Sequence, residues 1–119
     1  KKYKLKRLAV VVTDSRLEPL RHGVIGISVG FFGLHPLIDY RGKKDIFSRK
    51  LKMTQANIVD SLSAMAVLLM GEGNECTPIV IARGVKFIKF TNQDLHKKLV
   101  IDPKHDIYSP LLKNFIKKK

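Results

Sequence analysis

The chain has 119 residues, which suffices for one domain with a hydrophobic core, and its apolar fraction of 45% is ordinary for a globular protein. A lone cysteine, Cys76, excludes an internal disulfide, and no apolar run is long enough to span a membrane or to form a signal peptide. We therefore expect a soluble, cytoplasmic protein with no membrane partner and a single domain over residues 1–119.

The net charge of +13 raises the question of nucleic-acid binding. Of the 23 Lys and Arg residues, five lie in residues 1–7 and four in residues 113–119, and neither end contains an acid. Nucleic-acid grooves usually interleave basic and aromatic residues on one surface. We interpret the two ends as solvated tails and expect no nucleic acid as a partner. A non-catalytic basic module that binds nucleic acid or an acidic protein through these tails remains the alternative.

The first predicted element is a buried strand over Leu8 to Val12, a run of five apolar residues. It ends in Thr13-Asp14-Ser15, which places three oxygen-bearing side chains together. The following segment, VIGISVGFFGL, is β-branched and aromatic, and glycines interrupt it. Glycines inside a strand pattern indicate a bulge or close packing, and we favour that interpretation over a phosphate-binding loop. They are Gly23, Gly26, Gly30 and Gly33.

A polar segment over residues 35–51 leads to the clearest helix of the chain. In the polar segment we expect local ion pairs among Asp39, Arg41, Asp45 and Arg49. The helix is predicted over Thr54–Met70, with Thr54 as its N-cap and Gly71 as its terminator. Its apolar stripe is so wide that the helix should be buried on several sides. The stripe includes Ile58, Leu62, Met65 and Leu69.

Three further strands and a short helix are predicted after the long helix. Pro78–Ala82 has the pattern of a second buried strand, and residues 85–90 and Leu99–Ile101 have weaker strand patterns. Ser109-Pro110 is typical of a helix start, and the closing lysines at 117–119 suit a helix C-terminus. We therefore expect an α+β fold, in which a mixed or antiparallel sheet packs against one long buried helix at about 54–70.

The residues that carry reactive groups favour oxygen ligands over other chemistry. The four histidines are scattered without zinc-site spacing, no serine lies in a G-x-S-x-G motif, and Cys76 has no neighbouring histidine. Glu72 and Glu75 follow the helix at its negative end, where carboxylates need open water or a cation. With Asp14 and Ser15 they suggest a site for Mg²⁺ or Mn²⁺. A solvated acidic loop is the alternative.

Four motifs in a fixed order carry a family resemblance. They are Thr13-Asp14-Ser15, Arg21-His22-Gly23, Pro36-Leu37-Ile38-Asp39-Tyr40-Arg41-Gly42, and Met70-Gly71-Glu72-Gly73-Asn74-Glu75. Each is weak by itself, but from about Val10 to Gly84 the set resembles the coenzyme F-420 γ-glutamyl ligase family. The resemblance implies that the chain, which begins at Lys1, is the C-terminal half of a family member and is inactive without the N-terminal half.

The resemblance also implies an activity. Family members are GTP- and divalent-metal-dependent ligases that join L-glutamate to an acceptor carboxylate through an acyl phosphate, and they form homodimers. The acceptor implied is a deazaflavin, coenzyme F-420-0, with a pterin of the folate pathway as the runner-up. Asp14, Ser15 and Glu72 match metal positions, of which Ser15 and Glu72 match the same ion. The stretch that lines the nucleotide in family members matches Met70, Gly71, Glu72, Gly73, Asn74, Glu75, Cys76 and Thr77. The resemblance identifies no catalytic residue.

The chain departs from the family pattern at several positions. Leu17-Glu18 replaces a Gly-Arg pair, which removes a cation that could hold an anionic substrate. Leu20 replaces an aromatic residue, and Ser61 replaces a glutamate. Glu72 replaces a glutamine, so we expect the added charge to tighten metal binding.

Overall fold

The computed structural model describes residues 4–112 of the chain. Two antiparallel strand pairs and one main helix confirm the predicted α+β class, and neither strand pair is parallel. The elements are β1 (Val10–Leu17), β2 (Val24–Phe32), β3 (Leu37–Asp39), β4 (Gln55–Asn57), α1 (Ile58–Met70), the 3₁₀ helix η1 (His96–Lys98) and α2 (Ser109–Leu112).

Strands β1 and β2 form an antiparallel ribbon in which Val10 pairs with Phe32 and Leu17 with Val24. The pairing shifts between Val12 and Thr13, so that Val29 is an extra residue in β2. The bulge expected in the glycine-rich segment is therefore confirmed. The predicted strand began two residues too early and ended too soon, because pairing with β2 runs from Val10 to Leu17 and Asp14 lies inside β1. It is also not buried, since Val10 and Val12 are each 56% exposed. Strand formation depends more on the partner strand than on local propensity.

Helix α1 packs on this ribbon through a glycine of β2. A methyl group built on Gly26 would lie 2.5 Å from the backbone oxygen of Ser63, so only a residue without a side chain allows this approach. Ser63 and Val59 are the buried residues of α1. The close-packing interpretation of the glycines thus holds for Gly26, and it fixes the helix against the first part of β2.

The predicted start of the long helix is wrong by four residues. Residues 55–57 form β4, which pairs with β3, and Asn57 replaces Thr54 as the N-cap by accepting a hydrogen bond from Asp60 N at 3.1 Å. The helix is also less covered than expected, since Leu68 is 82% exposed. A two-stranded ribbon covers one face of a helix and leaves the opposite face open. Gly71 ends the helix as predicted.

The later strand predictions are wrong, whereas the short terminal helix is confirmed. Pro78–Ala82 and Leu99–Ile101 run as irregular chain, because no partner strand lies beside them in the described part of the molecule. Of residues 85–90, Phe90 alone forms a bridge, to Leu34. Helix α2 begins at Ser109, and the closing lysines at 117–119 lie outside the described residues.

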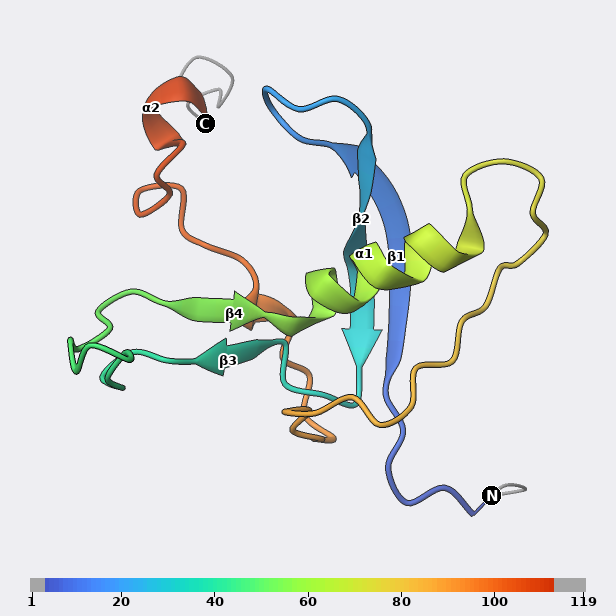
Figure 1. Cartoon of the computed structure of the whole chain (residues 1–119), viewed down its shortest axis with the longest axis horizontal. Coiled ribbons are helices and arrows are strands. Elements are labelled where there is room, and N and C mark those ends of the chain that lie inside the picture. Colours follow the sequence, from blue (N-terminus) through green and yellow to red (C-terminus); the bar gives the residue numbers. More distant parts are fainter. Residues whose placement is uncertain (1–3, 113–119) are drawn as a thin grey trace.

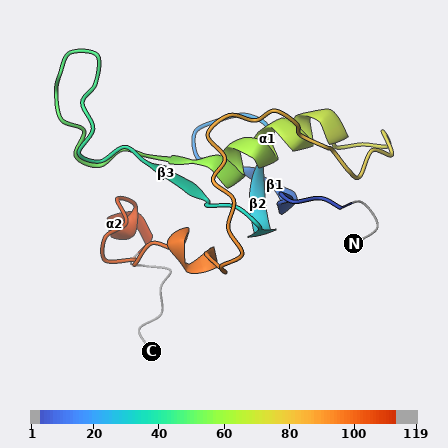
Figure 2. The same ribbon diagram turned by 90° about the horizontal axis from the view of Figure 1, so that it is seen from below.

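Helix α1 crosses the β1–β2 ribbon and separates two projecting parts of the chain (Figure 1). The β3–β4 arm, residues 37–57, extends from the N-terminal end of the helix, and the loop that begins at Gly71 extends from its other end. In Figure 2 the chain after α1 crosses to the other side of β3, where η1 and α2 lie. Within residues 4–112, none of the helices is long and apolar enough to pass through a bilayer.

The two basic ends lie mostly outside the described residues, which cover residues 4–7 of the first tail and none of residues 113–119. Residues 4–7 are exposed, as a solvated tail requires. The guanidinium of Arg7 lies 5.9 Å from the centre of the Phe90 ring, so this part of the tail also contacts the body of the molecule.

Candidate functional site

The end of β1 and the loop after α1 meet through side chains on one face of β1. Thr13 Oγ1 donates to Met70 Sδ at 3.8 Å, and Ser15 Oγ donates to Glu72 Oε2 at 3.2 Å. Thr13 can reach the last residue of α1 and Ser15 the loop after it, because residues two apart in a strand share a face. The Ser15–Glu72 contact joins two motifs that are 57 positions apart in the sequence.

Asp14 lies on the opposite face of β1 from Ser15. Burial alternates along the strand, so that Thr13 and Ser15 are half-buried whereas Asp14 and Arg16 are exposed. The Asp14 carboxylate accepts a hydrogen bond from the backbone N–H of Ser15 at 2.8 Å. The structure therefore brings Ser15 and Glu72 together and directs Asp14 away from them.

The loop from Gly71 to Thr77 turns back on itself at the helix end. Gly71 has φ +80° and donates its N–H to Val67 O at 2.9 Å, which satisfies one of the last helical carbonyls. The Glu75 carboxylate accepts from Gly73 N at 2.8 Å, and Thr77 Oγ1 donates to Glu75 O at 3.1 Å. Residues 72–77 are exposed, so water can solvate both carboxylates.

The oxygen groups of this site are of the type that a hard divalent cation prefers, but they are too few to form a complete coordination site. Carboxylate and hydroxyl oxygens are the ligands that Mg²⁺ and Mn²⁺ select, and Mg²⁺ usually keeps several waters. Glu72 and Ser15 offer two such groups side by side, and Asp14 offers another on the far face of β1. Residues 4–112 contain no group of three or more His, Cys, Asp or Glu side chains that could hold a metal ion together.

Two of the positions at which the resemblance leads us to expect another residue have local structural partners. Glu18 forms an ion pair with Arg16, whose Nε donates to Glu18 Oε1 at 2.8 Å. Ser61 Oγ donates to the Asn57 carbonyl at 2.6 Å, next to the N-cap of α1. Glu18 thus neutralises a neighbouring cation.

The ion pairs expected in the β3–β4 arm are present as two separate pairs. Arg41 binds Asp39 through Nε and Nη2, and these hydrogen bonds hold the pKa of Asp39 at about 2. Arg49 binds Asp45 through Nε at 2.9 Å. The pKa of Asp45 is lowered, chiefly because its carboxylate accepts the backbone N–H of Arg49.

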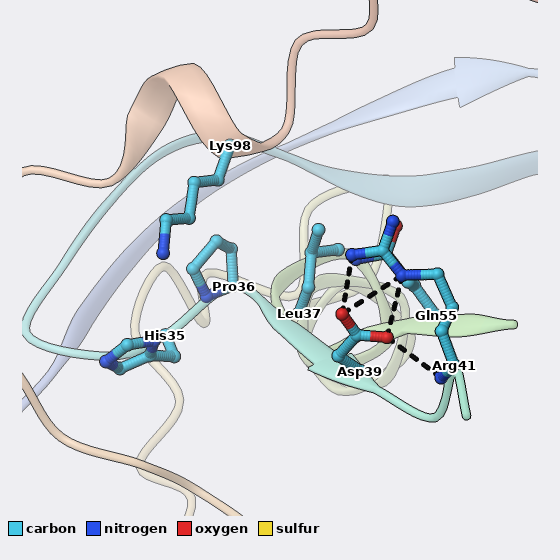
Figure 3. Close-up of a pocket in the computed structure, with 7 residues that line it drawn as sticks. All are labelled: His35, Pro36, Leu37, Asp39, Arg41, Gln55 and Lys98. Carbon is cyan, nitrogen blue, oxygen red and sulfur yellow. Dashed lines mark hydrogen bonds and ion pairs between the residues drawn. The ribbon is translucent and has the colours of Figure 1, made fainter. Parts of the chain in front are cut away.

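A cavity lies near the base of the arm, and sequence reasoning missed it. This basic cavity has a volume of about 360 Å³. It is lined by His35, Pro36, Leu37, Asp39, Arg41, Gln55 and Lys98. In Figure 3, Lys98 reaches from η1 toward His35 and Pro36, while Asp39 and Arg41 face each other on the far side of Leu37. No local pattern links Lys98 to His35, because 63 positions separate them in the sequence.

Comparison with known proteins identifies relatives of the chain. The model of a family described as "F420-0:Gamma-glutamyl ligase" matches residues 1–84. A protein of Methanocaldococcus jannaschii, named coenzyme F420:L-glutamate ligase, is 46% identical over 79 residues, which are 66% of this chain and 32% of that protein. A protein of the same name from Methanococcus maripaludis is 39% identical over 103 residues, which are 87% of this chain and 41% of that protein.

A third relative of the same name, from Methanopyrus kandleri, is 36% identical over 103 residues, which are 85% of this chain and 41% of that protein. The chain thus spans about a third to two fifths of the length of these relatives. The family match covers the β1–β2 ribbon, the arm, α1 and the loop after it, and therefore both residues of the Ser15–Glu72 contact.

Proposed function

The chain belongs to the F420-0:gamma-glutamyl ligase family, and from this premise we propose that the protein joins L-glutamate to an acceptor carboxylate. The match over residues 1–84 supports the proposal, as does the activity in the names of the relatives. The acceptor that these names favour is a deazaflavin, coenzyme F420-0.

We propose a reaction in two steps with GTP as co-substrate. An oxygen of the acceptor carboxylate attacks the γ-phosphorus of GTP, which forms an acyl phosphate and releases GDP. The α-amine of glutamate then attacks the acyl carbon, phosphate leaves with the bonding electrons of the C–O bond, and the nitrogen loses a proton. Residues 70–77 would line the nucleotide. Bound Mg²⁺ or Mn²⁺ would neutralise phosphate oxygens in the first step.

The observation that carries this proposal is the 3.2 Å contact between Ser15 Oγ and Glu72 Oε2. It supports a shared ion for these two side chains, next to the proposed nucleotide loop. Asp14 lies on the other face of β1, so it does not join Ser15 and Glu72 in holding this ion. The proposed assignment of Asp14 to a second ion rests on the resemblance alone.

The experiment that tests the function offers the intact protein L-glutamate, GTP and Mn²⁺ together with coenzyme F420-0 or a dihydropteroate-type acceptor. Mass spectrometry should detect the acceptor with one glutamyl residue added, and GDP and phosphate should form in equal amounts. Replacing GTP by ATP tests the nucleotide. GDP formation without any glutamylated acceptor, or no reaction with either acceptor, would contradict the proposed ligase activity.

We also propose that the protein acts as a homodimer in a reducing cytoplasm. The exposed thiol of Cys76, the lone cysteine, suits a reducing compartment. The sparse burial within the chain, considered in the Discussion, supports self-association.

A further inference from the structure

The charges that line the basic cavity do not balance. Its lining includes one carboxylate, Asp39, and Arg41 engages it through Nε and Nη2. The third nitrogen of the guanidinium, Nη1, donates to no other described residue. In the described part of the chain, no carboxylate lies within ion-pair distance of Lys98. One uncompensated positive charge and several free N–H donors therefore surround the cavity.

The fold holds the segments that carry these groups in fixed positions. His35 N donates to Lys89 O at 2.8 Å, and Thr91 N donates to Gly33 O at 3.1 Å, so residues 89–91 are tied to the loop before β3. The ring of His96 in η1 stacks on Phe31 of β2 with a centroid distance of 4.7 Å. Lys98 thus extends from an anchored helix turn and not from a loose loop.

We propose that the basic cavity binds an oxyanion, either a carboxylate or a phosphoryl group, at a site separate from the Ser15–Glu72 contact. Lys98 Nζ would donate a charge-assisted hydrogen bond and His35 would bind as the imidazolium, while Arg41, on the far side of Leu37, stays paired with Asp39. Gln55 supplies a neutral donor at the same wall. Leu37 and Pro36 supply the apolar part of the lining, between His35 and the Asp39–Arg41 pair.

The two sites lie at opposite ends of α1. Ile58 N, at the start of the helix, donates to Pro36 O beside the cavity at 2.8 Å, whereas Glu72 follows the helix end at Met70. The 13 residues of α1 span roughly 20 Å at about 1.5 Å per residue. A single phosphate or glutamate molecule therefore cannot occupy both sites, and the basic cavity requires its own ligand group.

His35 should report on the bound anion. Burial, together with the charges of Lys89 and Lys98, lowers the pKa of His35 below its usual value. Asp39 and Arg41 face the cavity as a neutral pair. An anion beside the ring would favour the imidazolium, so binding should raise the pKa of His35 and affinity should increase as the pH falls.

The test titrates the intact protein with inorganic phosphate and, separately, with L-glutamate, without nucleotide or metal. NMR follows the ring signals of the histidines, and a His35→Asn variant assigns the signal of His35. We expect a saturable shift and a raised pKa for His35. The Lys98→Met variant should bind about tenfold more weakly, since one charge-assisted hydrogen bond is lost. Lys97→Met, which makes the same charge change on the same helix turn outside the cavity, should bind as the wild type does.

Each outcome decides the proposal. A response to phosphate alone assigns a phosphoryl group, and a response to glutamate alone assigns a carboxylate. If neither anion shifts the His35 signal, or if Lys97→Met and Lys98→Met weaken binding equally, the cavity is not an oxyanion site. Circular dichroism checks that the Lys97→Met and Lys98→Met variants are folded. Lys98→Arg keeps the positive charge and should therefore retain anion binding. Because the titration contains neither nucleotide nor metal, its failure would leave the ligase proposal intact.

Discussion

Glu72 carries its charge just beyond the C-terminal end of α1, where unpaired carbonyls already make the potential negative. Its hydrogen bond from Ser15 satisfies one oxygen but brings no positive charge. Glu75, in contrast, turns back to the backbone N–H of Gly73 in its own loop. Glu72 is therefore the acid of this loop that is best placed to gain from a cation.

The first prediction concerns Glu72 and metal binding. Glu72→Ala should lower the affinity for Mn²⁺ by roughly tenfold or more in the presence of GTP, because a charged oxygen ligand is lost. Glu72→Gln should have a smaller effect, since it keeps an oxygen at the same place. Isothermal titration calorimetry on the intact protein measures both. Asp94→Asn is the matched control, because Asp94 is an exposed carboxylate that also accepts one hydrogen bond, from His96 N. An unchanged affinity in Glu72→Ala would remove Glu72 from the proposed site.

The second prediction concerns Asp39 and acid stability. Hydrogen bonds from Arg41 depress the pKa of Asp39 from 3.8 to about 2 in the folded protein. A depressed pKa contributes stability that is present above the unfolded pKa and is lost as the pH falls through the folded value. The advantage of the wild type over Asp39→Asn in thermal unfolding should therefore be constant above about pH 5 and shrink between roughly pH 4 and pH 2. A difference in melting temperature that does not change over this range would contradict the assignment.

The contact between α1 and β2 depends on a glycine, and it gives the third prediction. Gly26→Ala places a methyl group against the Ser63 carbonyl and should destabilise the protein by about 1–3 kcal/mol, because the helix must move away from the ribbon. Gly30→Ala in the same strand is the control. Its methyl group would meet Val12 Cβ at 3.9 Å, an ordinary contact. Chemical denaturation compares the two, and equal stabilities would show that α1 does not pack this closely.

The boundaries of the elements show where local patterns lose their predictive value. The end of α1 follows from Gly71, but the predicted stripe is not the packed face of the helix. Met65 is 44% and Leu69 is 59% exposed, whereas Val59 and Ser63 are buried. The start of α1 does not follow from a local pattern, because residues 55–57 gain more from pairing with residues 37–39 than from helix formation. Likewise, the apolar run at Pro78–Ala82 has strand propensity but no partner strand in the described residues. It therefore does not form a strand.

The molecule as a unit buries little of its apolar surface. The buried apolar side chains within residues 4–112 include Leu34, Val59 and Leu95, whereas Ile46 is 91% and Phe47 is 70% exposed on the arm. The Cα radius of gyration is 17.1 Å, compared with about 13.5 Å for a compact domain of this length. Contiguous exposed apolar surface marks contacts with other protein surfaces, and Ile46 and Phe47 are neighbours on the arm.

The fourth prediction follows from this open shape and from the proposed homodimer. Sedimentation equilibrium should give twice the monomer mass at micromolar concentration. Ile46→Ser combined with Phe47→Ser should shift the equilibrium toward the monomer, because it removes two exposed apolar side chains of the arm. Lys86→Ser on the exposed chain after α1 is the control and should leave the dimer unchanged. A monomer at all concentrations for the wild type would contradict the homodimer.

The sequence by itself determined the α+β class, the helix end at Gly71, the local ion pairs of the arm and the family, since these depend on neighbouring residues and on motifs in fixed order. The tertiary structure alone decided which face of β1 carries Asp14, that Ser15 meets Glu72, and that Lys98 meets His35 in one cavity. These features depend on strand register and on packing between segments 57 or more positions apart. Local propensity determines neither the register of a strand nor its packing against distant segments. A register shift of one residue would move every side chain of the strand to the other face.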